Sequence, residues 1–307
     1  MSMEVEISQQ EPEPDQFLTF NFGFRARLAN HIFELASVYG MARELQRTPV
    51  FYIVERKYEN QLKEVEKALP GLVSRYKIRR GPVPKDAEKM DIGKNCCQYY
   101  DIAGYRGRSA PLLHLTGQFY QSFKYFEKNK DEILSFVSPR KEFKTLPMAN
   151  SSNFISCIHV RRGDFVDHLH QATDLTFTRN AWKKITQDVG GEGRKYLTVV
   201  MGDDQKFEKQ IFPYGHISNS TKPVPFNNTI WISGNSPTDD LIYARYNCDS
   251  VLITAPSSTF GWWLGYISKG QRVYHMDIQQ TKDAVSGQMR VEDFYPASWH
   301  KLNISIS

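Results

Sequence analysis

Residues 154–160 read FISCIHV, and they are followed by RNAWKKITQDV at 179–189 and KYLTVVMG at 195–202. The first and third segments are short apolar runs of the kind that form buried strands, whereas the second has helical periodicity. The alternation continues along the chain, with helices expected in QKFEKQIF, TDDLIYARYN and TFGWWLGYIS and strands in TIWIS, SVLITA and RVYHM. Strands separated by helices at this spacing predict a parallel, doubly wound sheet and therefore an α/β fold.

The first half of the chain begins with the same kind of unit. FLTF (17–20) is predicted as a strand, a helix follows it, and VFYIV (50–54) is the next strand, which makes a β–α–β unit. Apolar residues line one face of this helix at the expected spacing: Leu28, Ile32, Leu35, Tyr39 and Ala42.

The middle of the chain, from about residue 58 to 108, is charged and irregular. Its basic run RYKIRRG (75–81) is interpreted as a solvated face. Regular patterns return with a strand in PLLHLTG (111–117) and a helix in SFKYFEKNKDEILSFV (122–137).

Pro139 and the polar residues up to 152 have the composition of a linker. Residues 1–15 are acidic and contain proline, and we expect them to form a disordered lead. The linker separates an expected N-terminal α/β lobe at 16–145 from an expected C-terminal α/β lobe at 146–307. A length of 307 residues is sufficient for two such lobes.

Composition excludes several classes of protein. The chain is 40% hydrophobic and 13% aromatic, which argues against disorder, and its net charge is only +5. Such a mild basic excess argues against a nucleic-acid partner but is compatible with a pocket for one small anion. The sequence contains no stretch of the roughly 18 apolar residues that a membrane span requires, so no membrane span is predicted.

The four cysteines, Cys96, Cys97, Cys157 and Cys248, have no CxxC spacing, so we expect no zinc site. Cys157 lies in an apolar run and is interpreted as a small buried hydrophobic residue. The adjacent Cys96 and Cys97 would bond to each other only with strain.

Four triplets fit the N-glycosylation acceptor pattern, and they begin at Asn150, Asn219, Asn227 and Asn303. They suggest a chain that folds in the lumen of the secretory pathway, although the first residues show no recognisable signal peptide.

Ligands of open parallel sheets bind beyond the carboxyl ends of the strands, and four loops there carry polar or charged residues. The loops are NFGFRAR followed by Asn30, RRGDFVDHLH (161–170), GDD (202–204) and PSST (256–259). Arg161 and Arg162 could neutralise a diphosphate, because a guanidinium matches phosphate geometry. Hydroxyl groups at the start of a helix, as at Ser257, Ser258 and Thr259, also suit an anion.

Each of these residues also has a purely structural interpretation. Ser258 and Thr259 are common helix caps, and two acidic residues after a strand, Asp203 and Asp204, often form a turn and a cap. Arg161 and Arg162 could instead pair with Asp164 or Asp167 in a structural ion network. Candidates for acid–base chemistry follow in the same loop: Asp164, Asp167, His168 and His170.

Four motifs resemble those of one family, the α-1,2-fucosyltransferases. HVRRGDF (159–165) resembles the family's HxRRGD(Y/F), and RLANHIFE (27–34) looks like its GRLGNxxF element. The segment from Asp240, a helix and a strand that lead into SSTFGWW (257–263), resembles the family's STFSWW region, and FYPASW (294–299) is similar to its FxPxxW. The similarity runs in the family's order from about residue 20 to 301.

The sequence departs from these motifs at three positions. Arg25 and Ala29 stand where the family usually has small residues or glycine, and Gly261 stands where serine is common. The stem that anchors animal Golgi members in the membrane is not visible.

The resemblance implies a GT-B fold, in which two Rossmann-like lobes hold a ligand cleft between them. GDP-fucose would bind mostly to the C-terminal lobe, and a glycan acceptor to the N-terminal lobe. It further implies an inverting transfer of L-fucose to a glycan hydroxyl, expected to be the 2-hydroxyl of galactose, with no metal and no cofactor. The expected location is the Golgi lumen.

The same resemblance assigns roles to individual residues. Arg161 would clamp the diphosphate with Arg162 as its support, and Asp164 or Asp167 would be the base. The remaining expected donor-binding residues are His159, Ser258, Thr259, Asn30 and Asp203. Two alternatives remain open: a fucosyltransferase with another linkage or a protein acceptor, and an inactive descendant that binds nucleotide sugars or glycans.

Overall fold

The structure is a computed structural model that describes residues 16–23, 26–139, 143, 145–167, 169–189, 193–218, 220 and 228–305. Its described strands form two sheets whose pairings are all parallel, so the predicted α/β class is confirmed. The expected lead at 1–15 lies outside the described residues, and the expected domain boundary at 145/146 stays a prediction.

The first sheet has five strands in the order β3-β2-β1-β5-β4. Its elements are β1 (Phe17–Phe20), α1 (Leu28–Glu44), β2 (Thr48–Ile53), α2 (Arg56–Ala68), α3 (Pro70–Val73), β3 (Lys77–Arg80), β4 (Glu88–Met90), β5 (Leu112–Leu115) and α4 (Lys130–Ser135). The strand β1 lies at the centre of the sheet and is buried throughout, which explains why FLTF is wholly apolar apart from Thr19.

Two predictions for this half need correction. The region expected to be irregular contains much of the regular helix α2, in which the buried residues Leu62, Val65 and Ala68 form a narrow stripe among charged residues. The helix predicted at 122–137 is instead two short 3₁₀ turns followed by α4. Phe123, Tyr125 and Phe126 are all buried there, a spacing that one face of an α-helix does not provide. The basic side chains of the run 75–81 are exposed as expected, whereas Tyr76 within it is buried, and Lys77–Arg80 form the edge strand β3.

The second sheet has seven strands in the order β12-β11-β10-β6-β7-β9-β8. Its elements are β6 (Asn153–Val160), α5 (Leu175–Val189), β7 (Lys195–Gly202), α6 (Gln205–Ile211), β8 (His216–Ile217), β9 (Ile230–Ile232), α7 (Pro237–Asn247), β10 (Ser250–Ile253), α8 (Thr259–Ile267), β11 (Arg272–Met276), α9 (Val291–Phe294) and β12 (His300–Leu302).

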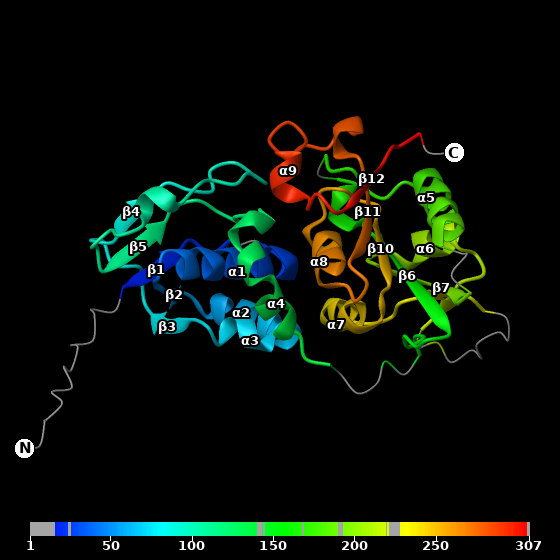
Figure 1. The fold of residues 1–307 in the computed structure, drawn as a ribbon, viewed down its shortest axis with the longest axis horizontal. Helices are drawn as coiled ribbons and strands as arrows, with labels where there is room; N and C mark the ends of the chain where they lie inside the picture. The colour runs from blue at the N-terminus through cyan, green and yellow to red at the C-terminus, as the bar shows by residue number, and fades with distance from the viewer. Residues whose placement is uncertain are drawn as a thin grey trace, which may run out of the picture.

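The central strand β6 is buried on both faces, as a strand with helices on either side must be. Ile158 and Val160 pack in a cluster with residues of α5 and α6, whereas Ile155 and Cys157 pack in a cluster with residues of α7 and α8. Figure 1 shows these two pairs of helices on opposite sides of the sheet. The sheet therefore has the doubly wound arrangement that the alternation predicted.

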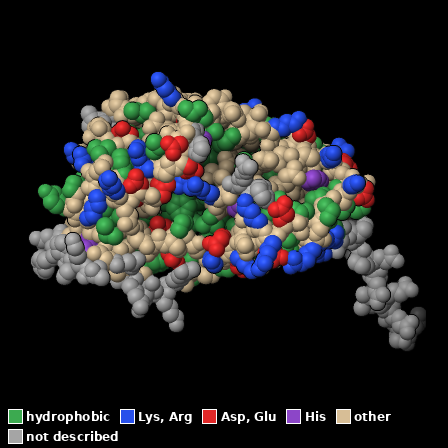
Figure 2. All heavy atoms as spheres, turned by 180° about the vertical axis from the view of Figure 1, so that it is seen from behind, with side chains coloured by type: hydrophobic (Ala, Val, Ile, Leu, Met, Phe, Trp, Pro, Cys, Tyr) green, Lys and Arg blue, Asp and Glu red, His purple; other side chains and the backbone are tan. Residues whose placement is uncertain are grey.

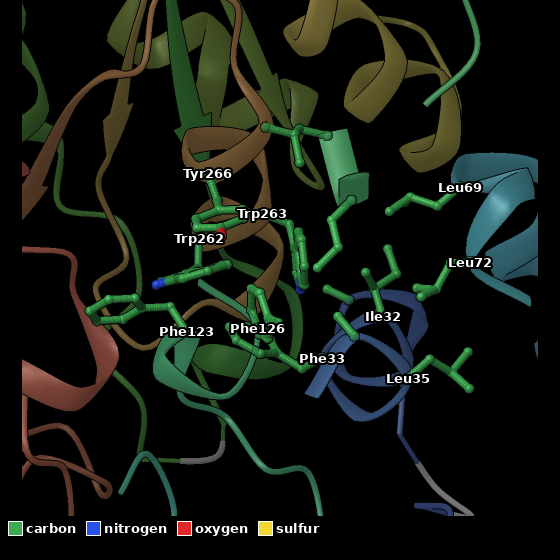
Figure 3. Close-up of a cluster of buried hydrophobic side chains, with 14 of the residues drawn as sticks. Ile32, Phe33, Leu35, Leu69, Leu72, Phe123, Phe126, Trp262, Trp263 and Tyr266 are labelled. Atoms are coloured by element: carbon green, nitrogen blue, oxygen red, sulfur yellow. The ribbon is translucent and has the colours of Figure 1, made fainter. Parts of the chain in front are cut away.

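The two sheets are joined through α1 and α8, which lie side by side at the middle of the molecule (Figure 1). Phe33 of α1 packs against Trp262 and Trp263 of α8, with ring centroids 4.5 and 5.2 Å apart. Phe126 stacks on Trp263 at 5.6 Å, and Figure 3 shows these rings gathered between the helices. One continuous core therefore connects the two halves of the chain.

The structure confirms that Cys157 is buried in the core, but it is not simply a small hydrophobic residue. It forms a disulfide with Cys248, which follows α7, and the two Cα atoms are 5.7 Å apart. The sulfur atoms of the adjacent Cys96 and Cys97 are also joined. Within the described ranges, no helix has both the length and the apolar character that crossing a bilayer requires.

We expect Phe33→Ala to lower the free energy of unfolding by ~3–5 kcal/mol, because it leaves a cavity in the aromatic cluster between α1 and α8. Thermal and denaturant unfolding measure the change. Tyr214→Ala is the matched control, since this aromatic side chain is 92% exposed, and it should have little effect. Equal stability of the two variants would contradict the packing described here.

Candidate functional site

A pocket of about 550 Å³ lies where the two halves of the chain meet. The loops that follow β6, β7 and β10 line it, together with the first turns of α1, α7 and α8. The residues singled out from sequence that line it are Asn30, His159, Arg161, Asp164, His170, Asp203, Ser257, Ser258 and Thr259. The carboxyl ends of parallel strands are the expected place for such a site.

Arg161 lies between two carboxylates at the carboxyl end of β6. Its guanidinium forms ion pairs with Asp164 and Asp203, and its side chain is 15% exposed. Asp164 is also 3.1 Å from the guanidinium of Arg27, and Asp203 accepts a 2.8 Å hydrogen bond from the backbone N–H of Arg162. The pair of Arg161 with Asp164 that the sequence suggested therefore exists, and Asp203 joins it at the lining of the pocket. Within the described part of the chain, neither Asp167 nor the guanidinium of Arg162 takes part in this network.

Arg162 points elsewhere. Its guanidinium lies over the ring of Phe207 in α6, 4.3 Å from the centroid, and one of its N–H groups faces the carbonyl of Thr173 at 3.4 Å. It is not among the described residues that line the pocket. Its expected role as a second diphosphate clamp stays a prediction.

His159 is buried beneath the start of α8. Its Nε2 is 3.3 Å from the hydroxyl of Ser258. Burial, with a smaller contribution from Arg161, lowers the pKa of His159 to about 3, so the ring is neutral near pH 7. A Cβ at Gly261 would come within 2.6 Å of this ring. The glycine that departs from the family's motif is thus required by the close approach of α8 to His159.

The start of α8 is joined to the start of α1. Ser258 caps α8 by accepting a hydrogen bond from the N–H of Gly261 at 3.3 Å, so the interpretation of Ser258 as a helix cap is confirmed. Thr259 donates a hydrogen bond of 2.8 Å to the amide oxygen of Asn30, which also accepts one of 3.0 Å from Gln121. These contacts hold two helix N-termini at the same pocket, where their partial positive charges favour an anion.

The acid–base candidates are distributed unevenly. Asp164 lines the pocket, whereas Asp167 is exposed and is not among the described lining residues. His168 lies outside the described residues. His170 lines the pocket and faces Asp283 at 3.2 Å, and its hydrogen bond to that carboxylate raises the pKa of His170. Asp204 is confirmed as the cap of α6, since it accepts a hydrogen bond from Phe207 N–H at 2.9 Å.

Basic and acidic side chains are interspersed over the face shown in Figure 2. We therefore attribute the electrostatics of the site to the local groups described above rather than to a surface field of one sign.

Residues 2–303 of the chain match Glycosyl transferase family 11. The chain belongs to this family. It is 44% identical over 97% of its length to the Caenorhabditis elegans protein C06E1.7, provisionally named a glycosyltransferase, of which the match covers 83%. It is 34% identical over 91% of its length to a C. elegans galactoside 2-alpha-L-fucosyltransferase, of which the match covers 75%. A crystal structure of the fucosyltransferase NodZ from Bradyrhizobium matches 81% of this chain and 92% of that chain with 12% identity and a TM-score of 0.47.

Two buried acids of this family 11 member were missed from the sequence. Asp240, on α7, lines the pocket and accepts a 2.6 Å hydrogen bond from the hydroxyl of Ser233, and burial raises its pKa to about 7. Glu208, on α6, lies behind Gly202, and burial raises its pKa to about 8. Asp240 is the first residue of the segment that resembles the family's STFSWW region. Helical periodicity alone did not show that its side chain lines a pocket.

We expect Glu208→Gln to reduce the decrease in the free energy of unfolding between about pH 4.5 and pH 8. The folded protein keeps the Glu208 proton where the unfolded chain releases it, so wild-type stability falls as the pH rises from about 4.5 to 8. The melting temperature of Glu208→Gln should exceed that of the wild type by several degrees at pH 8 but not at pH 4. Exposed Glu292→Gln is the control, and identical pH profiles for wild type and Glu208→Gln would contradict the assignment.

Proposed function

We propose that the protein is an inverting α-1,2-fucosyltransferase that moves L-fucose from GDP-fucose to the 2-hydroxyl of galactose in a glycan acceptor. Membership of family 11 supports the reaction class, and the name of the 34% identical relative supports the linkage. The observation that carries the proposal is the position of Arg161, whose guanidinium faces a pocket that two helix N-termini also approach.

We further propose that the two sheets are the two Rossmann-like lobes of a GT-B architecture. The N-terminal lobe would span residues 16–145 and face the acceptor, and the C-terminal lobe would span 146–307 and hold GDP-fucose. The residues that line the pocket come from both halves of the chain, each of which contains one sheet, and this supports the arrangement.

The diphosphate is proposed to lie against Arg161 and the first turn of α8. Negative charge grows on the departing GDP as the bond to fucose breaks, and a preorganised cation stabilises that charge. Asp164 and Asp203 fix the guanidinium in place before the donor binds, so little reorganisation is needed. With Arg161 and the helix N-termini in these roles, we propose that transfer needs neither a metal ion nor a cofactor.

The guanine base is proposed to lie against Asp240. A carboxyl group offers two oxygens side by side, and guanine presents an N–H and an NH₂ group on one edge with matching spacing. Asp240 is 5% exposed and lies within the pocket lining, so a base that reached it would be shielded from water. Such a contact selects guanine over bases that lack the amino group.

Inversion by direct displacement requires a base that accepts the proton of the acceptor hydroxyl. Of the two carboxylates considered, Asp164 is proposed because it lines the pocket, whereas Asp167 is exposed. Its pairing with two arginines keeps Asp164 fixed in position.

The enzyme is proposed to act in the Golgi lumen of the secretory pathway. The Cys157–Cys248 disulfide supports an oxidising compartment, where such bonds persist. Asn150 and Asn303, which begin two of the glycosylation triplets, are exposed. Asn219 and Asn227 lie outside the described residues.

We expect Arg161→Ala to reduce kcat/KM for fucose transfer by at least 10²-fold, because it removes the cation that faces the leaving diphosphate. Turnover is measured with GDP-fucose and a panel of glycans, and the linkage of each product is determined by NMR. The exposed Arg108→Ala, which also removes a paired arginine, is the control. Near-normal turnover by Arg161→Ala would contradict the role of Arg161. A wild-type product with another linkage would replace the proposed α-1,2 linkage. Binding of GDP-fucose without turnover by the wild type would indicate an inactive descendant.

We expect Asp240→Asn to lose the preference for GDP over inosine diphosphate, which lacks the guanine amino group. A charge-assisted hydrogen bond contributes about 1.5–3 kcal/mol, so the wild type should prefer GDP by roughly tenfold or more in calorimetry at a pH above the Asp240 pKa of about 7, where the carboxyl group is ionised. Asp239→Asn makes the same substitution one residue away and should keep the preference. An unchanged preference in Asp240→Asn would place the base elsewhere.

A further inference from the structure

A second cavity of about 530 Å³ lies beside the donor pocket, between α1, α2 and the start of α7. Three residues, Arg27, Leu28 and Pro237, line both cavities, so the two are immediate neighbours. Its volume falls in the range of about 300–1,000 Å³ that is usual for small-molecule sites.

His31 gives this cavity an unsatisfied polar group. Its side chain is 2% exposed, its ring stacks on Phe22 with centroids 4.1 Å apart, and its Nδ1 lies 3.1 Å from a carboxylate oxygen of Glu34. Its Nε2 has no hydrogen-bond partner among the described residues. A buried polar atom without a partner costs free energy, which a ligand that completes the bond would recover.

A hydroxyl group fits His31 in either tautomer. If Nδ1 donates its proton to Glu34, Nε2 can only accept a hydrogen bond, and if Nδ1 accepts, Nε2 must donate. A sugar hydroxyl is both a donor and an acceptor and satisfies both cases. Gln61, Ser236 and Thr238 add neutral polar groups to the same lining.

The charges around the cavity are balanced in pairs. Lys67 is 2.7 Å from Glu64, and Arg27 is 3.1 Å from Asp164. Paired charges of this kind present little net field to a ligand, so the lining suits a neutral molecule better than an anion. The first turns of α1 and α7 line both cavities, and the donor pocket differs in that the first turn of α8 also lines it.

We propose that this second cavity is a subsite for a neutral sugar unit of the acceptor glycan, oriented by a hydrogen bond to Nε2 of His31. The assignment rests on the proposed function, because it concerns the second substrate of that transfer. A glycan that occupied the cavity would extend past Leu28 and Pro237 toward the donor pocket, where a hydroxyl could meet the fucose.

Gln61→Trp tests the subsite by placing a large side chain in the cavity from α2. Glu66→Trp is the matched control, since Glu66 is exposed on the same helix and lies about 100° or more around it from each α2 residue that lines the cavity. The acceptors are methyl β-galactoside and lactose, and the enzyme is the full chain with GDP-fucose. We expect Gln61→Trp to raise KM for lactose at least tenfold, with KM for GDP-fucose and the rate of GDP-fucose hydrolysis within twofold of wild type.

The two acceptors locate the sugar unit. A raised KM for both places galactose in the cavity, and a raised KM for lactose alone places the second sugar there. His31→Phe keeps a ring that can stack on Phe22 but removes both ring nitrogens, so the contact of Nδ1 with buried Glu34 is lost together with Nε2. It should raise the same KM about fivefold. Glu64→Trp, at an exposed position of α2 that also lines the cavity, provides a second filling variant should Gln61→Trp not fold. Unchanged acceptor KM values in folded variants, shown by normal GDP binding, overturn the subsite alone. A wild-type protein that fucosylates no galactoside overturns both the subsite and the proposed function.

Discussion

The packing of α1 against α8 is the contact on which the rest of the structure depends. Phe33 and Trp262 bury their rings against each other between the two sheets, and this contact sets the distance between the helix starts. Asn30 and Thr259 can then form a hydrogen bond across the pocket. Without the aromatic contact, the first turn of α1 would not face the loops at the carboxyl ends of the second sheet.

Charged side chains at the pocket also hold one another in fixed positions. Arg161 is fixed by Asp164 and Asp203, one from its own loop and one from the loop after β7. Two buried groups behind this network are neutral near pH 7, because burial lowers the pKa of His159 to about 3 and raises that of Glu208 to about 8. Arg161 is therefore a cation held in a fixed position at the pocket, whereas Arg27, which also lines it, is 64% exposed.

Much of this arrangement could be predicted from the sequence, for a clear physical reason. Strands in a parallel sheet place their carboxyl ends at one edge, so loops 161–170, 202–204 and 256–259 had to meet. Contacts between distant elements could not be predicted. Phe207 from α6 determines the direction of Arg162, and the partner of Cys157 is 91 residues away in the chain. The amphipathic helix α2 was missed because charged residues surround its narrow buried stripe.

The most direct test is hydrogen–deuterium exchange of the wild-type protein with and without GDP. A nucleotide bound where the helix starts converge should slow exchange of the backbone amides in the first turns of α1 and α8 and in the loop after β6. Protection confined to other elements, or no protection at saturating GDP, would contradict the claim that the contact between α1 and α8 builds the nucleotide site.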